Sequence, residues 1–136
     1  MTKKAIFLLV TLFLINIYVG ICKGWGEDFW ISAGFHLSGG FLIAMLLFSF
    51  YNNDFASLRQ YLKILVVIAM TLGVGVVWEF LEFIASQTLV QPLYNFYGRH
   101  FYFMGNLADT MSDLLMDTLG AIAFLITYYG LKTKKG

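Results

Sequence analysis

Four long apolar segments alternate with polar or aromatic connections along the chain. The segments cover residues 5–22, 33–51, 62–85 and 108–131, which gives them lengths of 18 to 24 residues. A helix of about 20 apolar residues crosses the hydrocarbon core of a bilayer, whereas strands are usually 3–10 residues long. The pattern therefore predicts an all-α integral membrane protein, with four transmembrane helices in an antiparallel bundle and residues 1–136 forming a single transmembrane domain.

The longest connection, residues 87–105, has an unusual composition. It contains the only proline, Pro92, and six aromatic residues between positions 94 and 103. Aromatic side chains collect at the boundary between membrane and water. We therefore expect this connection to contain a short helix that lies on the membrane or dips into it.

The composition agrees with a membrane protein and excludes an ordinary soluble globule. Apolar residues make up 60% of the chain and charged residues 12%, which is about half the share found in soluble proteins. No basic patch of the kind that binds nucleic acid is present. We expect a multi-pass protein of the inner or plasma membrane, without a nucleic acid partner.

Basic residues are distributed unequally between the two sides of the predicted bundle. Seven of them stand on the side of the termini and the 52–63 loop: Lys3, Lys4, Arg59, Lys63, Lys132, Lys134 and Lys135. The opposite side has only Lys23 and Arg99. Because positive charge favours the cytoplasmic side of a membrane, both termini are predicted to be cytoplasmic.

Six ionisable residues interrupt three of the apolar segments. They are His36 in the second segment, Glu79 and Glu82 in the third, and Asp109, Asp113 and Asp117 in the fourth. Spacings of three and four residues place Glu79 with Glu82, and the three aspartates with one another, on single helical faces. Ionisable groups within a membrane are costly and are usually functional, so these residues mark a candidate site.

The helical rise of 1.5 Å per residue allows the depth of these groups to be counted from the cytoplasmic ends. Asp117 lies roughly 22 Å from Lys132, Glu79 roughly 24 Å from Lys63, and His36 roughly 22 Å from Tyr51. Three groups on three helices thus come out at one depth, in the outer leaflet. We expect them to meet there.

Five carboxylates cannot all ionise in a medium of low dielectric constant without a counter-charge. A bound cation, protons on the carboxyl groups, or water and Arg99 from the outer surface could each compensate them. Helical bundles hold metal ions through carboxylates and histidines on facing helices, at the spacings seen here. The metal interpretation makes His36, Glu79, Asp113 and Asp117 the ligands of a divalent ion, which would be Mg, Mn, Fe or Zn. Glu82 is then a candidate general base.

Two other interpretations remain open. The cluster could be a proton or cation pathway, and because four spans are few for a complete pathway, that interpretation predicts a homo-oligomer. It could also be a hydrogen-bonded polar network that fixes helix packing. Asp109 could serve only as the N-cap of the last helix. Gly73, Gly75 and Gly120 are predicted to be positions of close helix packing, as are Gly40 and Ala44 on the stripe that begins at His36.

Three stretches together resemble a known group of proteins. FHLSGGFLIAML from residue 35, WEFLE from residue 78 and DTMSDLLMDTLGA from residue 109 are similar to VanZ-like small polytopic membrane proteins. The resemblance covers roughly residues 28–125 and is strongest to inner-membrane proteins of the YjdF type. VanZ-like proteins typically have an arginine and an asparagine near the last acidic helix, where this chain has its aspartates.

The resemblance implies a role at the cell envelope and does not imply a reaction. Combined with the metal interpretation, it leads us to expect a membrane protein that acts on, or senses, an envelope lipid or a lipid-linked head group. As a hydrolase or transferase, such a protein would use the ion to polarise a phosphoryl or acyl oxygen or to activate water.

Overall fold

The computed structural model describes residues 2–23 and 29–133, and these residues are helical apart from short connections. Lys134 and Lys135, which entered the charge count, lie outside the described residues. The elements are five α-helices and one short 3-10 helix: α1 Thr2–Lys23, α2 Phe29–Phe50, η1 Asp54–Ser57, α3 Gln60–Thr88, α4 Val90–Tyr97 and α5 Leu107–Thr133. No β-strand occurs among the described residues.

Four of these helices, α1, α2, α3 and α5, are long and apolar enough to cross a membrane. They correspond to the four predicted segments and begin or end up to four residues away from the predicted limits. The additional residues are mostly aromatic or polar. The helices are longer than the predicted segments because a helical backbone can continue beyond the apolar stretch that marks it in the sequence. Large apolar side chains such as Phe7, Val77 and Ile126 are exposed on the outer faces, as expected for helices that contact lipid.

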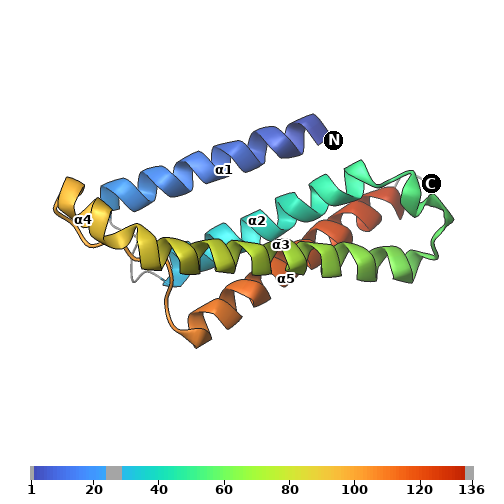
Figure 1. Ribbon diagram of the computed structural model, residues 1–136. Coiled ribbons are helices and arrows are strands. Elements are labelled where there is room, and N and C mark those ends of the chain that lie inside the picture. Colours follow the sequence, from blue (N-terminus) through green and yellow to red (C-terminus); the bar gives the residue numbers. More distant parts are fainter. Residues whose placement is uncertain (1, 24–28, 134–136) are drawn as a thin grey trace.

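Consecutive long helices run in opposite directions along the bundle, so α2 and α5 are parallel to each other (Figure 1). The first residues of α1 and the last residues of α5 lie at the same end of the bundle as η1. Helix α4 lies at the opposite end (Figure 1). This arrangement places Lys3, Arg59, Lys63 and Lys132 at a common end. We call it the terminal end, and the opposite end, with Asp109 and α4, the acidic end.

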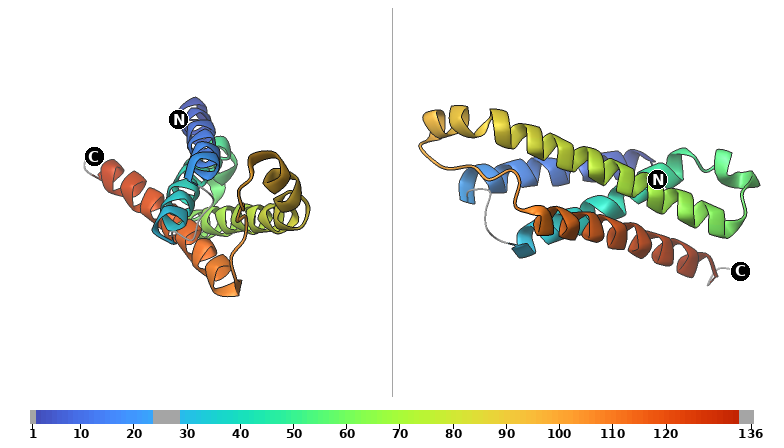
Figure 2. Two further views of the ribbon diagram at one scale, coloured as in Figure 1. Left: turned by 90° about the vertical axis from the view of Figure 1, so that its left-hand side faces the viewer. Right: turned by 60° about the horizontal axis from the view of Figure 1, so that its bottom comes forward.

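Helix α2 lies between α1 and α5 (Figures 1 and 2). Its most extensive packing is against α5, and α3 packs against both α2 and α5. Helix α1 contacts mainly α2. A hydrogen bond of 2.7 Å between the hydroxyls of Thr2 and Ser49 joins these two helices at the terminal end.

The apolar core occupies the terminal half of the bundle. Its buried side chains come from α2, η1, α3 and α5: Ala44, Phe48, Phe55, Val67, Ala121, Phe124 and Leu125. Phe124 makes edge-to-face ring contacts with Phe41 and Phe48, at centroid distances of 5.6 and 5.8 Å. The buried ionisable groups, His36, Glu79, Asp113 and Asp117, lie in the half nearer the acidic end.

The predicted short helix in the aromatic connection is α4. Pro92 stands in its first turn, where a missing N–H group breaks no helical hydrogen bond. The helix ends at Gly98, which adopts a left-handed conformation with φ of 66° and donates its N–H to the carbonyl of Tyr94. No residue of α4 is buried.

Candidate metal centre

Two glycines allow α2 and α5 to approach closely next to the polar residues. A Cβ atom added to Gly40 would lie 2.6 Å from the Cα of Asp117, and one added to Gly120 would lie 2.6 Å from the backbone nitrogen of Phe41. Real Cβ atoms are not found that close to a neighbouring backbone. The prediction of close packing is therefore confirmed for these two positions, and the approach brings His36 against the aspartates of α5.

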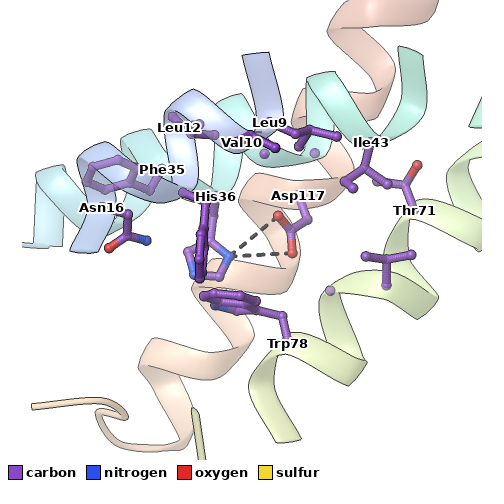
Figure 3. Close-up of a pocket in the computed structure, with 15 residues that line it drawn as sticks. Leu9, Val10, Leu12, Asn16, Phe35, His36, Ile43, Thr71, Trp78 and Asp117 are labelled. Atoms are coloured by element: carbon purple, nitrogen blue, oxygen red, sulfur yellow. Dashed lines mark hydrogen bonds and ion pairs between the residues drawn. The ribbon is translucent and has the colours of Figure 1, made fainter. Parts of the chain in front are cut away.

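The His36 imidazole lies between two carboxylates of α5. Its Nε2 atom is 3.6 Å from Asp113 Oδ2, and its Nδ1 atom is 3.5 Å from both oxygens of Asp117 (Figure 3). All three side chains are buried, with exposed fractions of 9% or less. One turn separates the two aspartates, so a single ring contacts both.

Helix α3 adds Glu79, which is 7% exposed. One ligand atom each from His36, Glu79 and Asp113 can be chosen so that all three lie within 4.8 Å of one another. The depth count predicted that His36, Glu79 and Asp117 would lie at one level. The structure brings His36 and Glu79 together with Asp113 and places Asp117 on the other side of the imidazole.

A buried carboxylate oxygen in this group has no hydrogen-bond partner among the described residues. This atom is Glu79 Oε1. The Thr110 hydroxyl is also buried and also lacks a hydrogen-bond partner among these residues. An unsatisfied buried polar group costs about 1–3 kcal/mol, and more when it is charged. The Thr110 hydroxyl lies beside the same carboxylate, and a cation bound next to Glu79 Oε1 would satisfy the oxygen that has no partner.

The Asp117 carboxylate occupies space that Gly75 of α3 leaves open. A Cβ atom at Gly75 would collide with Asp117 Oδ2 and would lie 3.3 Å from the side chain of Leu114. Gly75 was predicted to be a close-packing position, and this is confirmed. The same prediction for Gly73 is wrong: Gly73 is exposed, and no atom lies within 4 Å of the Cβ it would carry.

Glu82 lies one turn further toward the acidic end and is half-buried. Its Oε1 atom accepts a hydrogen bond of 2.7 Å from the indole Nε1 of Trp78. Trp78 also makes an edge-to-face contact with Phe13 of α1, at a centroid distance of 6.2 Å. Trp78 therefore packs against α1 and in addition donates a hydrogen bond to the Glu82 carboxylate.

Two hydroxyl groups beside the cluster were not anticipated from the sequence. Ser32 donates a hydrogen bond of 3.2 Å to Asp113 Oδ1, and Thr110 contributes the unpartnered hydroxyl. Ser32 is four residues before His36 and Thr110 three before Asp113, so the helical period would have placed both on the same faces. Hydroxyl side chains are uncharged, so they did not stand out in the apolar segments as the ionisable residues did.

Asp109 lies at the margin of the cluster, one turn before Asp113. Asn106 is the N-cap of α5, because its side-chain oxygen accepts the N–H groups of Ala108 and Asp109 at 2.9 and 3.1 Å. Asp109 is therefore not the cap, and its carboxylate accepts the N–H of Gly105 at 3.2 Å. His100 is exposed and its ring lies against that of Tyr94.

The geometry can be compared with that of known metal sites. Metal–ligand bonds of about 2.0–2.2 Å keep adjacent ligand atoms about 3.0–3.5 Å apart. The distance of 3.6 Å between His36 Nε2 and Asp113 Oδ2 is close to this range. The ligand atom of Glu79 lies within 4.8 Å of the other two, so the group would offer an ion one imidazole and two carboxylates.

Fold and site together define a multi-pass membrane protein with a buried His/Glu/Asp cluster between its helices. The chain belongs to the family described as predicted membrane protein (DUF2238), whose sequence pattern matches residues 1–134. No curated protein and no solved structure matches the chain.

Proposed function

We propose that the protein binds a divalent metal ion through His36 Nε2, Glu79 and Asp113, and that it acts on or senses an envelope lipid or a lipid-linked head group. The observation that carries this proposal is the buried, unpartnered Glu79 oxygen next to the imidazole and the second carboxylate. A cation is the partner that would satisfy all three groups at once.

Electrostatics supports a cation at this position. Five carboxylates stand on α3 and α5 near the acidic end, and no lysine or arginine occurs between residues 64 and 98 or between residues 100 and 131. Two like charges 4 Å apart repel each other by about 4 kcal/mol at an effective dielectric constant of 20. A divalent ion turns this repulsion into attraction.

The surrounding residues have separate roles in this proposal. Asp117, predicted from the sequence as a fourth ligand, contacts the imidazole nitrogen that faces away from the group of three, so it would orient His36. Ser32 would orient Asp113 through its hydrogen bond. The ion would act as a Lewis acid or lower the pKa of a bound water molecule. Glu82, held by Trp78, would accept the proton.

The envelope assignment is supported by the resemblance to VanZ-like and YjdF-type proteins and by the charge distribution. With the basic terminal end in the cytoplasm, the metal centre would lie in the outer leaflet. Lipid head groups of that leaflet would then be within its reach.

Metal analysis tests the proposal most directly. Protein purified without chelator should contain about one metal ion per chain, as a three-ligand site requires. The double variant Glu79→Gln/Asp113→Asn should lose this ion, while Asp109→Asn, a matched change at a half-buried aspartate outside the group of three, should retain it. Sub-stoichiometric metal that is the same in the wild type and the double variant would refute the proposal.

A second function, a proton or cation pathway, is favoured by one observation. Titratable groups continue along one face of α5, from Asp109 at the acidic end through Asp113 to Asp117 beside His36. A homo-oligomer in detergent and cation flux into liposomes would support this function. Strictly monomeric protein without flux would exclude it.

A further inference from the structure

An apolar pocket of about 360 Å³ lies between α1, α2 and α3 (Figure 3). It reaches two residues of the His/Glu/Asp cluster. His36 and Asp117 line it, together with residues of all three helices. Leu12 of α1 and Trp78 of α3 line the same pocket as the imidazole and the Asp117 carboxylate (Figure 3). The pocket therefore meets the imidazole that also belongs to the proposed metal centre.

The pocket exists because glycines line part of its wall and because of the position of α1. Gly39, Gly40 and Gly75 contribute no side-chain volume to its wall. Helix α1 packs mainly on α2, and its Phe13 reaches Trp78 of α3 through one ring contact. Space consequently remains between α1 and α3 on the terminal side of that contact.

The pocket is accessible from the outer surface of the bundle. Val10 of α1 and Val74 of α3 line it and are 52% and 41% exposed. Both residues belong to helices long and apolar enough to cross a membrane. Inside a bilayer the surrounding medium is hydrocarbon, so an apolar opening at this depth is filled by lipid chains and not by water.

The direction of the pocket matches that of a lipid molecule. On α2 it extends from His36 to Ile43, which is about 10 Å along the helix toward the terminal end. His36 and Asp117 line its other end, and Asp113 lies beyond the imidazole, at Nε2. A lipid of the leaflet at the acidic end would have its head group at that end and its tail pointing toward the membrane centre.

We propose that this pocket binds the hydrocarbon tail of an anionic, phosphate-bearing lipid whose head group reaches the metal centre. Tail binding depends only on the pocket, whereas recognition of the head group rests on the proposed metal function. The apolar wall suits the tail, and a metal ion held by His36, Glu79 and Asp113 suits a phosphate oxygen. The substrate or sensed ligand of the site is thus assigned to the class of anionic lipids.

A photoreactive lipid tests the tail site. The probe is palmitoyl phosphatidic acid with a diazirine in the middle of its acyl chain, in phosphatidylcholine liposomes that contain the protein. Irradiation should produce adducts on the pocket-lining segments of α1, α2 and α3. Phosphatidylcholine with the same diazirine chain should give fewer adducts, because it lacks a free phosphate monoester.

Gly39→Leu and Gly34→Leu form a matched pair for this experiment. Both glycines are on α2, and no atom lies within 4 Å of the Cβ that either would carry. Only Gly39 lines the pocket. Gly39→Leu should abolish the pocket adducts, and Gly34→Leu should retain them. A second pair on α3 is Val74→Phe in the pocket and Val77→Phe on the exposed face outside it.

The outcomes separate the tail site from the metal function. Equal adducts in both members of both pairs would overturn the tail site. Equal adducts from the phosphatidic acid and phosphatidylcholine probes would overturn the anionic head group. Metal content, measured on the same samples, should be unchanged in Gly39→Leu. Pocket adducts in a protein without metal would leave the tail site standing and overturn the metal function alone.

Discussion

His36 connects the buried carboxylates of α5, because each of its ring nitrogens lies against one of them. The distances of 3.5 and 3.6 Å place Asp117 at Nδ1 and Asp113 at Nε2. Histidines that bind metals commonly donate the N–H of their second nitrogen to a carboxylate, which fixes the tautomer and the orientation of the ring. Asp117 is placed to do this for His36.

Replacing Asp117 should weaken metal binding without removing the site. In Asp117→Asn the imidazole loses its anionic partner, and loss of such a contact typically lowers metal affinity about 10–100-fold. Competition titration with a fluorescent zinc chelator measures the change in affinity. Complete loss of metal, as expected for Glu79→Gln/Asp113→Asn, would instead identify Asp117 as a ligand. Asp109→Asn is the control, because Asp109 lies outside the group of three.

The sequence predicted the placement of some single residues correctly and of others incorrectly. His36, Glu79, Asp113 and Asp117 were identified because ionisable groups in apolar helices are rare and because helical rise is constant. The prediction that Gly73 packs closely was wrong, since Gly73 and Gly75 are two residues apart and face different directions on a helix. Only Gly75 faces Asp117.

At the scale of elements, the pairing of α2 with α5 determines the site. The buried stripe of α2 passes from His36 through Gly40 and Ala44 to Phe48, so polar, small and aromatic groups follow one another. On α5 the order is the same, from Asp113 and Asp117 through small residues to Phe124. Because the order matches, the polar residues of the two helices face each other at one end and the aromatic residues at the other. The small residues between them allow the helices to approach closely.

Gly40→Ala should separate these helices. The added Cβ would lie 2.6 Å from Asp117 Cα, and neither backbone can move away without shifting a whole helix. Overpacking of this kind costs about 1–3 kcal/mol, so thermal stability in detergent and metal content should both fall. Gly39→Ala, where no atom lies within 4 Å, is the matched control. Equal stability of the two variants would contradict the close packing.

At the scale of the whole molecule, polar and apolar interiors are divided along the bundle axis. The aromatic core lies toward the terminal end and the carboxylates toward the acidic end. Such a division suits a protein anchored by one half and functional in the other. It also makes the orientation in the membrane decisive, because orientation determines which compartment the carboxylates approach.

The orientation can be tested with single cysteines. In a Cys22→Ser background, which removes the only native cysteine, Gln91→Cys lies on α4 and Asn52→Cys precedes η1. A membrane-impermeant maleimide applied to intact cells should label Gln91→Cys. Asn52→Cys should be labelled only after permeabilisation, because the basic terminal end favours the cytoplasm. The reverse pattern would place the acidic end inside.

The sequence by itself determined the four spans and, to within one helical turn, the level of the polar groups. Both follow from local rules: a bilayer requires long apolar helices, and every residue advances a helix by the same rise. Only the tertiary structure decided that Asp113, and not Asp117, joins His36 and Glu79. It also decided that α1 leaves a pocket beside Gly39. These features depend on how side chains pack between helices distant in sequence, where one glycine sets the approach.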